Sequence, residues 1–418
     1  MTHRSTIRPA RYRQLIAGAA VLTLFVAACG DDDDDDAADT ATATAETTSA
    51  PATEPAGTEP ATTAPADTDA PATDAPPTTA AGGDTTAPAS TVAEADLDTN
   101  GDGEVIIGIA AAGPADDGAY YQAVVDAATE ISADRGFGEP VVVDNIQAAD
   151  AATAIGDLAQ QGVDIIIVGA SEIAEPLPQL ISEYPDVFWY CNCGAGFPED
   201  PGLAQSTDDG GEISYTAGYA TGLKLQEAGG DSVVFIGCCD LGFEKQAYMA
   251  FELGLQAVDP SYTLTYVPTG DFPFDFDNTA NATAALQTAV DQGADAVYPY
   301  LGGAHRPVVQ AANEAGLITM SAGSSKVCEP TEELDYDIAV KFDGGDYVRA
   351  AMEEIAAGEF QEGETKLFKV GVDPEPGAVI CDATPEEQAV MDDVYEQVAS
   401  GELEPQFAEI AAEAFAEG

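Results

Sequence analysis

Basic residues are scarce in this chain of 418 residues. Only 13 lysines and arginines stand against 75 aspartates and glutamates, which gives a formal net charge of −62. Arg4, Arg8, Arg11 and Arg13 lie at the start of the chain, so 13 − 4 = 9 basic residues remain downstream. A surface this acidic repels nucleic acid and anionic lipid headgroups. The composition therefore argues against a nucleic-acid partner and fits solubility in a salty medium.

Histidine and the usual catalytic motifs are also lacking. The only histidines are His3 and His305, which rules out a histidine-based metal site. The chain contains no G-x-S-x-G elbow, no P-loop and no H-E-x-x-H helix. A carboxylate pair for glycoside hydrolysis carries no information here, because 75 acids place some pair near any cleft. We expect no enzymatic activity, no catalytic residue, no metal and no cofactor.

No apolar run is long enough to span a membrane comfortably, and the longest, at the N-terminus, has a recognisable pattern. Residues 15–28 are apolar, too short to span a bilayer comfortably, and follow the four arginines. They end in Val26-Ala27-Ala28-Cys29-Gly30, which resembles a bacterial lipobox. The resemblance implies a signal peptide over 1–28, cleavage before Cys29 and a lipid anchor on its thiol; the alternative is an ordinary signal peptide with a chance cysteine. We expect a protein tethered to the extracytoplasmic face of the cell membrane.

Residues 29–103 lack the composition of a folded domain. Six aspartates occupy 31–36, and 37–95 consist mostly of Thr, Ala, Pro, Asp and Glu, with no aromatic or basic residue. Such a segment cannot bury enough apolar surface to fold, so it is predicted to be a disordered tether. At its end, residues 96–104 imitate a calcium loop through Asp96, Asp98 and Asn100. The twelfth position, where a calcium loop has a bidentate glutamate, is Ile107. In so acidic a chain this is expected as a chance match, and calcium binding is the alternative.

From residue 104 onward, short apolar strands alternate with helices of ordinary length. This alternation predicts α/β lobes, each a parallel sheet flanked by helices and built with right-handed crossovers. A break at Gly229-Gly230 and a restart near Asp231 predict two lobes, at about 104–228 and 229–370, joined by crossover hinge segments. The amphipathic segment 387–399 is expected to return to the first lobe. The predicted strands are 105–111, 141–143, 165–168, 187–190, 233–237, 263–267, 296–300 and 317–321. The predicted helices are 149–161, 173–183, 211–227, 244–258, 279–292 and 306–315.

The unit at residues 104–122 places polar side chains at a cleft. A strand runs into a Gly113-Pro114 break, and the helix that follows carries Tyr120. Ligands of open α/β sheets bind outside the carboxyl ends of the strands. We therefore expect Asp116 and Asp117 at the mouth of a cleft.

Four blocks of this chain resemble the basic membrane protein family. They are PADDGAYYQAVVDAATE, SVVFIGCCDLGFEKQAYMAFELGLQAVDP, TGDF and QGADAVYPYLGGAHRPVVQAANEAG, and the resemblance covers about 104–406. It implies a type 1 periplasmic-binding-protein fold and a lipoprotein that captures a small molecule for an ABC transporter permease. It also implies a monomer, and often a purine nucleoside as ligand. A ligand-sensing lipoprotein of the same fold, feeding a membrane receptor, is the alternative function.

The resemblance also implies a set of ligand-binding residues. Tyr120 and Phe272 match the two stacking aromatics, and Lys341 matches the family's lysine beyond the last strand. The full set is Asp116, Asp117, Tyr120, Tyr121, Gln122, Ser171, Glu172, Phe272, Gly302, Gly303 and Lys341. The family's ribose-binding aspartate has no counterpart in residues 321–326. A purine nucleoside or base is the expected ligand, and the acidic and aromatic segment 271–275 leaves an organic cation as the alternative.

Six cysteines lie in the predicted lobes, at Cys191, Cys193, Cys238, Cys239, Cys328 and Cys381. An even number in an exported protein predicts disulfides, with fifteen possible connectivities. The C-x-C and C-C spacings do not fit a zinc site. We expect pairing within a lobe, of Cys238 or Cys239 with Cys328.

Overall fold

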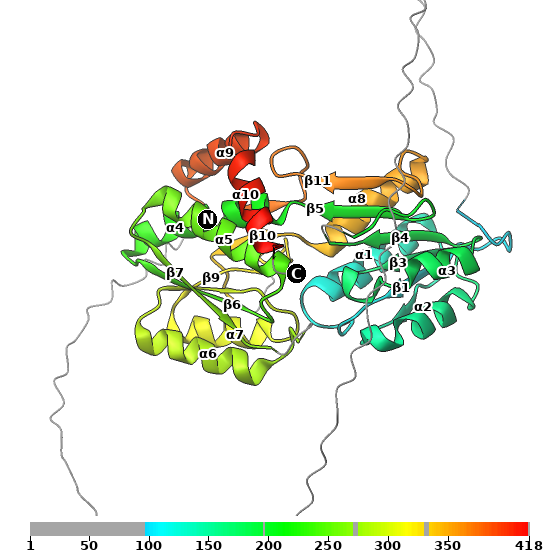
Figure 1. Ribbon diagram of the computed structural model, residues 1–418, viewed down its shortest axis with the longest axis horizontal. Coiled ribbons are helices and arrows are strands. Elements are labelled where there is room, and N and C mark those ends of the chain that lie inside the picture. The colour runs from blue at the N-terminus through cyan, green and yellow to red at the C-terminus, as the bar shows by residue number, and fades with distance from the viewer. Residues whose placement is uncertain (1–96, 195–196, 271–274, 330–333, 417–418) are drawn as a thin grey trace, which may run out of the picture. The chain divides into compact units, whose positions relative to one another are not determined.

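A computed structural model describes residues 97–194, 197–270, 275–329 and 334–416 (Figure 1). The predicted signal peptide, Cys29, the tether up to residue 96 and Phe272 lie outside these ranges. The described residues all belong to one compact unit, Thr86–Gly418. None of its described helices is both long enough and apolar enough to cross a membrane.

The first lobe is built on a six-stranded parallel sheet with the strand order β11-β5-β4-β3-β1-β2. Its strands are β1 (Ile107–Ala110), β2 (Val141–Val143), β3 (Ile165–Val168), β4 (Phe188–Asn192), β5 (Ala204–Asp208) and β11 (Thr365–Phe368). Because successive side chains of a strand point to opposite faces, Ile165 and Ile167 pack with α1 (Tyr120–Arg135) and α8 (Gly344–Ala357). The other face of β3 packs with α2 (Ala151–Ala159) and α3 (Leu177–Glu183). The apolar runs thus reflect strands buried on both faces.

The second lobe repeats this plan on a four-stranded parallel sheet with the order β7-β6-β8-β9. Its strands are β6 (Ser232–Gly237), β7 (Thr263–Pro268), β8 (Ala296–Pro299) and β9 (Ile318–Thr319). Phe235 of β6 packs with α4 (Gly210–Ala228) and α5 (Gly242–Val258). Ile236 packs on the opposite face with α6 (Thr279–Gln292) and α7 (His305–Ala315).

Helices α4 and α5 pack closely because each has a glycine at their contact. A Cβ atom at Gly218 of α4 would overlap the backbone of Phe251, and one at Gly254 of α5 would overlap that of Tyr215. This packing assigns α4 to the second lobe. The sequence boundary at residue 228 was wrong on this point, because the chain leaves the first sheet after β5 and crosses over before α4.

Two further crossings connect the lobes. β10 (Ile338–Lys341) pairs antiparallel with β12 (Gly377–Ile380), and a bridge from Met320 to Ile338 links β10 to the β9 segment. The chain passes from β10 to α8 and β11 in the first lobe and then returns to β12. These crossings are the hinge segments that the sequence predicted without locating them.

The C-terminal return differs from the expected one. The segment 387–399 belongs to α9 (Pro385–Ala399), which contacts α4 and β12 of the second lobe instead of the first. Its buried side chains Met391, Val394 and Val398 join the α4–α5 core. The return to the first lobe is made by α8, which packs on α1, and by β11 at the edge of the sheet. The last helix, α10 (Glu404–Ala414), lies against α5.

The folded region begins before residue 104. Leu97 is buried in the core beside β1, and the backbone N–H of Asn100 donates to the Asp164 carboxylate at 3.2 Å. The predicted tether therefore extended too far, because residues 97–103 are held against the first lobe. Their small and acidic side chains look like tether in sequence, but they form a hydrogen-bonded turn.

All six lobe cysteines are paired, as Cys191–Cys193, Cys238–Cys239 and Cys328–Cys381. The expected partner of Cys328 was therefore wrong, although no pair joins the two lobes. The reason lies in β12, whose pairing with β10 (Ile338 opposite Ile380) brings Cys381 to the segment that carries Cys328, with 5.2 Å between their Cα atoms.

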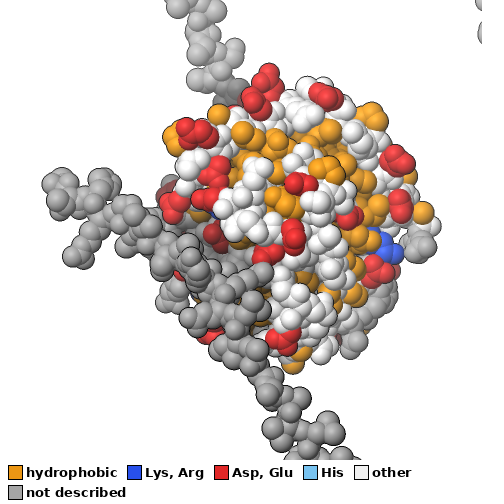
Figure 2. Space-filling view, turned by 90° about the vertical axis from the view of Figure 1, so that its left-hand side faces the viewer, with side chains coloured by type: hydrophobic (Ala, Val, Ile, Leu, Met, Phe, Trp, Pro, Cys, Tyr) orange, Lys and Arg blue, Asp and Glu red, His pale blue; other side chains and the backbone are white. Residues whose placement is uncertain are grey.

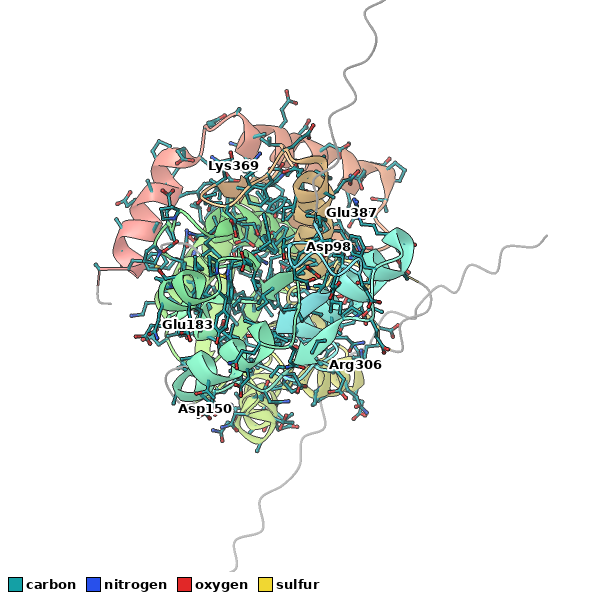
Figure 3. The ribbon with its side chains drawn as sticks, turned by 90° about the vertical axis from the view of Figure 1, so that its right-hand side faces the viewer. Asp98, Asp150, Glu183, Arg306, Lys369 and Glu387 are labelled. Carbon is teal, nitrogen blue, oxygen red and sulfur yellow. A yellow bond between two sulfur atoms is a disulfide. The ribbon has the colours of Figure 1, made fainter. Side chains whose placement is uncertain are left out.

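Acidic side chains dominate the charged surface of the described region. On the face in Figure 2 they are scattered among apolar and neutral groups, with few basic side chains. Asp150 and Glu183 lie at the outer edge of the first lobe in Figure 3, and both are exposed. This scatter is what a soluble acidic protein needs, and it forms no basic patch on the face shown in Figure 2.

Candidate ligand-binding site

One pocket of about 250 Å³ is lined by both lobes. In the first lobe it collects the segments that follow β1 and β3 and the last residues of β4 and β5. In the second lobe it collects the start of α5 and the segments after β7, β8, β9 and β10. These are the carboxyl ends of the strands of both sheets, where open α/β folds bind ligands.

The first-lobe wall contains Tyr120 and Tyr121, whose rings meet edge to face with 5.4 Å between centroids. The Tyr120 hydroxyl donates to the Gly169 carbonyl at 2.6 Å and accepts from Asn192 Nδ2, also at 2.6 Å. Asn192 Oδ1 in turn accepts from Ser206 Oγ at 3.1 Å. The chain of bonds fixes the Tyr120 ring, and burial raises the pKa of its hydroxyl well above the usual value. Tyr120 therefore offers the pocket a rigid ring face.

Glu172 lies on the same wall, on the short η2 turn (Ser171–Ile173) that follows β3. Burial raises the pKa of its carboxyl group, and a hydrogen bond from Tyr121 lowers it in part. Its Oε2 atom is buried and has no hydrogen-bond partner within the described part of the chain. Buried polar atoms without a hydrogen-bond partner are rare in folded proteins, so this oxygen is a candidate contact for a ligand.

Asp208 supplies a second carboxylate at the last residue of β5, where the first hinge crossing begins. Burial raises its pKa to about 6, and the neighbouring Asp209 carboxylate adds to the shift. Near neutral pH this group can gain or lose a proton in response to a nearby charge.

The second-lobe wall is aromatic. Phe243 stacks with Phe276 at 6.3 Å between ring centroids, and Tyr300 stacks with Phe342 at 5.5 Å. Tyr300 also lies 5.5 Å from Phe235 of the core, which fixes its position. The four rings give the pocket an apolar wall opposite Tyr120 and Tyr121, as planar ligands require.

A family model described as "ABC transporter substrate-binding protein PnrA-like" matches residues 105–371, more than half of the chain. The chain belongs to this family, Bmp. The match confirms the resemblance to the basic membrane protein family that the sequence blocks indicated. A substrate-binding protein of an ABC transporter works on the extracytoplasmic side, where it binds a small molecule for a permease.

Solved structures share the Bmp chain's fold. An ABC transporter solute-binding protein from Conexibacter woesei is 23% identical, covers 72% of this chain and 97% of its own length, and has a TM-score of 0.53. One from Aeropyrum pernix is 12% identical, covers 74% and 99%, and has a TM-score of 0.60. A transcriptional activator of the comK gene from Bacillus halodurans is 15% identical, covers 70% and 96%, and has a TM-score of 0.55. These likenesses confirm the type 1 periplasmic-binding-protein fold. No curated protein matches the chain.

Among the family's ligand positions, Tyr120, Tyr121, Ser171, Glu172 and Gly302 line the pocket. The acidic pair and its neighbour do not. Asp116 is exposed, while Asp117 is buried and accepts from the backbone N–H groups of Ala119, Tyr121 and Gln122 at 2.8–3.2 Å. Gln122 Oε1 accepts from the Gly118 N–H at 3.0 Å. Asp117 and Gln122 thus satisfy N–H groups at and before the start of α1, as capping side chains do.

Two other expected contacts are used inside the protein. The Gly302 N–H donates to the Phe276 carbonyl at 3.2 Å, and the Gly303 N–H donates to Asp277 Oδ1 at 2.6 Å. Lys341 Nζ donates to the Pro374 carbonyl at 2.7 Å and lines a different cavity. Its side chain points away from the pocket because it alternates along the chain with Phe342, which faces the ligand site.

Residues 321–326, which lack the family's ribose-binding aspartate, form a closed turn. Ser321 Oγ donates to the Ser324 carbonyl at 2.8 Å, and Ser325 Oγ donates to Asp346 Oδ2 at 2.6 Å. Of this segment only Ala322 lines the pocket. The turn therefore presents the methyl group of Ala322 to the pocket.

Several lining residues were missed by the sequence analysis. They are Asn192, Thr207, Asp208, Phe243, Gln246, Phe276, Asp277, Tyr300 and Phe342. Most follow a strand directly or begin a helix after one, so the rule that places ligands at strand ends could have found Asn192, Asp208 and Tyr300.

The turn that resembles a calcium loop uses its carboxylates internally. Asp98 accepts from the backbone N–H groups of Gly101, Asp102 and Gly103 at 2.8–3.1 Å, and Asp102 Oδ1 accepts from that of Glu104 at 3.0 Å. Among the residues that the structure describes, no group of three or more His, Cys, Asp or Glu side chains is placed to hold a metal ion.

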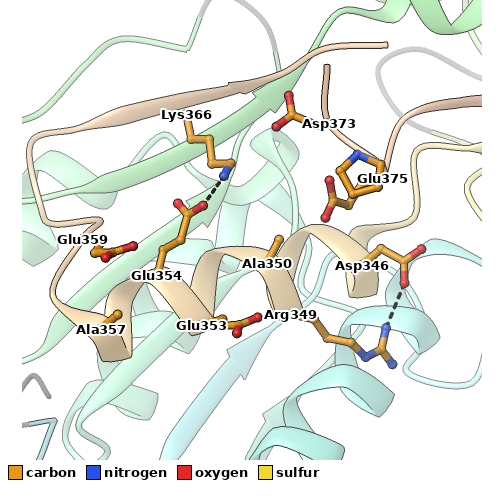
Figure 4. A pocket seen from close by; sticks show the side chains of 11 residues that line it. Asp346, Arg349, Ala350, Glu353, Glu354, Ala357, Glu359, Lys366, Asp373 and Glu375 are labelled. Carbon is orange, nitrogen blue, oxygen red and sulfur yellow. Dashed lines mark hydrogen bonds and ion pairs between the residues drawn. The ribbon is translucent and has the colours of Figure 1, made fainter. Parts of the chain in front are cut away.

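A larger cavity of about 650 Å³ lies along α8 (Figure 4). Its lining comes only from residues 346–375, and its two basic side chains are paired with acids of the same cavity. Arg349 contacts Asp346 at 3.1 Å, and Lys366 contacts Glu354 at 2.5 Å. Since only one segment builds this cavity, closure of the lobes would not enclose a ligand in it. The pocket between the lobes is the better candidate.

Proposed function

We propose that this chain is the lipid-anchored, solute-capturing component of an ABC importer, and that it holds a small planar polar ligand between its lobes. The observation that carries the proposal is a pocket at the strand ends of both sheets with aromatic side chains on both walls. Closing the lobes on a flat ring would bury it between Tyr120 and the rings of Phe276 and Tyr300. Purine nucleosides and bases have a suitable flat shape, and organic cations are the second class.

Ligand capture can be tested by a thermal-shift screen of nucleosides, bases, sugars, amino acids and organic cations. A true ligand raises the melting temperature by mass action, and it is recovered chemically unchanged. Phe276→Ala should weaken its binding by about 1–3 kcal/mol, the range found for stacking on an aromatic side chain. Phe415→Ala is the matched control, because Phe415 is 43% exposed and lies outside the pocket. Equal affinity of the Phe276→Ala variant and the wild type would place the ligand elsewhere.

The anchor and the transport role need separate experiments. In cells, Cys29→Ala should release the protein from the membrane fraction, whereas wild type stays with it; a variant that remains in the membrane would contradict the lipid anchor. Deleting the chain should abolish uptake of the identified solute. Normal uptake combined with a lost response to the solute would instead indicate a sensor.

A further inference from the structure

We infer that the ligand carries a positive charge on or beside its planar ring, an inference that rests on the proposed function of the pocket between the lobes. The first observation is the charge of the lining. Glu172, Asp208 and Asp277 are acidic, and the lining residues in the described part of the chain include no lysine or arginine. Acids are common all over this surface, so the surroundings of each acidic side chain in the pocket are what distinguish it from the rest.

Glu172 contributes an acceptor atom that the protein leaves without a partner. Its Oε2 atom is buried without a partner within the described residues, and Glu172 is one of the residues that line the pocket. A cationic N–H group of a ligand would supply both the missing donor and the missing counter-charge. Charge-assisted hydrogen bonds of this kind are about twice as strong as neutral ones.

Three donors of the lining are engaged by the protein itself. Asn192 Nδ2 donates to Tyr120, the Tyr120 hydroxyl donates to Gly169, and the Gly302 N–H donates to the Phe276 carbonyl. A ligand rich in acceptors, such as a purine ring with its unprotonated nitrogens, would find these donors taken. A ligand rich in donors would find the carboxylates of Glu172 and Asp208.

Two of the basic side chains of the second lobe are paired with other groups. Lys341 donates to the Pro374 carbonyl, and Lys245 lies 3.5 Å from Asp240. The raised pKa values of Glu172 and Asp208 agree with burial that no cation compensates. The rings of Phe243, Phe276, Tyr300 and Phe342 would attract a cation through their faces.

The test uses pairs of compounds that differ mainly in charge. 1-Methylnicotinamide, methylated on its ring nitrogen, is a planar cation and nicotinamide is its neutral counterpart; benzamidinium and benzamide form a second pair. Calorimetry at about 0.15 M salt, which screens the exposed acids, should show each cation binding about tenfold or more tightly than its neutral partner. Cation and neutral forms that bind equally in both pairs, or none that binds, would overturn the inference.

Two isosteric variants locate the effect. Glu172→Gln should reduce the preference for the cation by about tenfold. Glu175→Gln removes the same charge from an exposed position three residues further on and should leave the preference unchanged. Equal losses in both variants would mean that the cations respond to surface charge, and this would overturn the inference.

Adenosine separates the inference from the proposed function. If it binds more tightly than both cations and Phe276→Ala weakens it, the pocket is the ligand site and only the positive charge is refuted. If cations bind with the expected preference but Phe276→Ala has no effect, the proposed site itself is refuted.

Discussion

The hinge contains a buried acid, Glu212, whose removal should change how stability depends on pH. Glu212 lies in the first turn of α4 and is only 4% exposed, and its Oε2 atom accepts from the Val370 N–H at 2.9 Å across two hinge crossings. Burial raises its pKa from 4.5 to about 7; Asp209 and Glu404 add to this, while the Val370 N–H and Lys369 oppose it. The folded protein therefore holds a proton that the unfolded chain has lost near neutral pH.

The sign of the effect follows from proton linkage. Between pH 4.5 and about 7 the folded state binds more protons than the unfolded state, so the free energy of unfolding falls as the pH rises. The rise of the Glu212 pKa from 4.5 to about 7 corresponds to a loss of at most about 3 kcal/mol in the free energy of unfolding at high pH. Because the effective dielectric constant at buried sites exceeds that of dry protein, we expect about 1–2 kcal/mol. The uncharged Glu212→Gln side chain can still accept from Val370 and does not titrate.

We expect Glu212→Gln to equal wild type at pH 4 and to exceed its free energy of unfolding by about 1–2 kcal/mol at pH 8. Denaturant titration at the two pH values measures this difference directly. Glu409→Gln, at an exposed position on α10, removes the same charge and should show no such pH dependence. A Glu212→Gln effect of the same size at both pH values would refute the reasoning, because it would then arise from packing rather than from the proton.

Three further predictions follow from the pocket, the cysteines and the start of the fold. The cation 1-methylnicotinamide should bind up to about tenfold more tightly at pH 7 than at pH 5, as measured by calorimetry. Asp208 has a pKa of about 6 and must be ionised to pair with this cation. The groups facing Asp208 are Asp209 and the hydroxyls of Tyr120, Tyr298, Tyr300 and Tyr347, and the raised pKa values of these tyrosines keep them neutral over this range. Asp208→Asn should flatten the profile, and a profile that persists would exclude Asp208 as its source. Mass spectrometry of unreduced digests should show a Cys328–Cys381 cross-link and no free thiol among the six lobe cysteines; a Cys238–Cys328 peptide would contradict the fold of this region. A chain shortened to begin at residue 86 should keep its melting temperature. A chain that begins at residue 104 lacks the buried Leu97 and should lose roughly 2–4 kcal/mol of stability. Equal stability of the two shortened chains would mean that residues 97–103 do not belong to the folded region.

Much of the fold could be predicted because it depends on local patterns. The segments 141–143, 165–168 and 279–292 were predicted with the bounds that the structure shows, since each is a continuous apolar run or a helix that begins after Asn278 and ends at Gly293. The sequence analysis missed β5, β10, β11 and α8, and of these β5 and β11 have more polar patterns than the predicted strands. Thr365–Phe368, for example, alternates exposed and buried positions at the edge of the sheet and resembles a loop in sequence.

Sequence alone determined the two-lobed α/β class, the family and the role of strand ends, because these follow from periodicity and from the order of motifs along the chain. Only the tertiary structure decided which side chains face the ligand. Asp117 caps a helix and Lys341 bonds to Pro374, while Phe342, one residue further, lines the pocket. A side chain's direction depends on register and on which lobe its element joins, and these are set by contacts between residues far apart in the chain. For that reason α4 could not be assigned to its lobe before its glycine contact with α5 was seen.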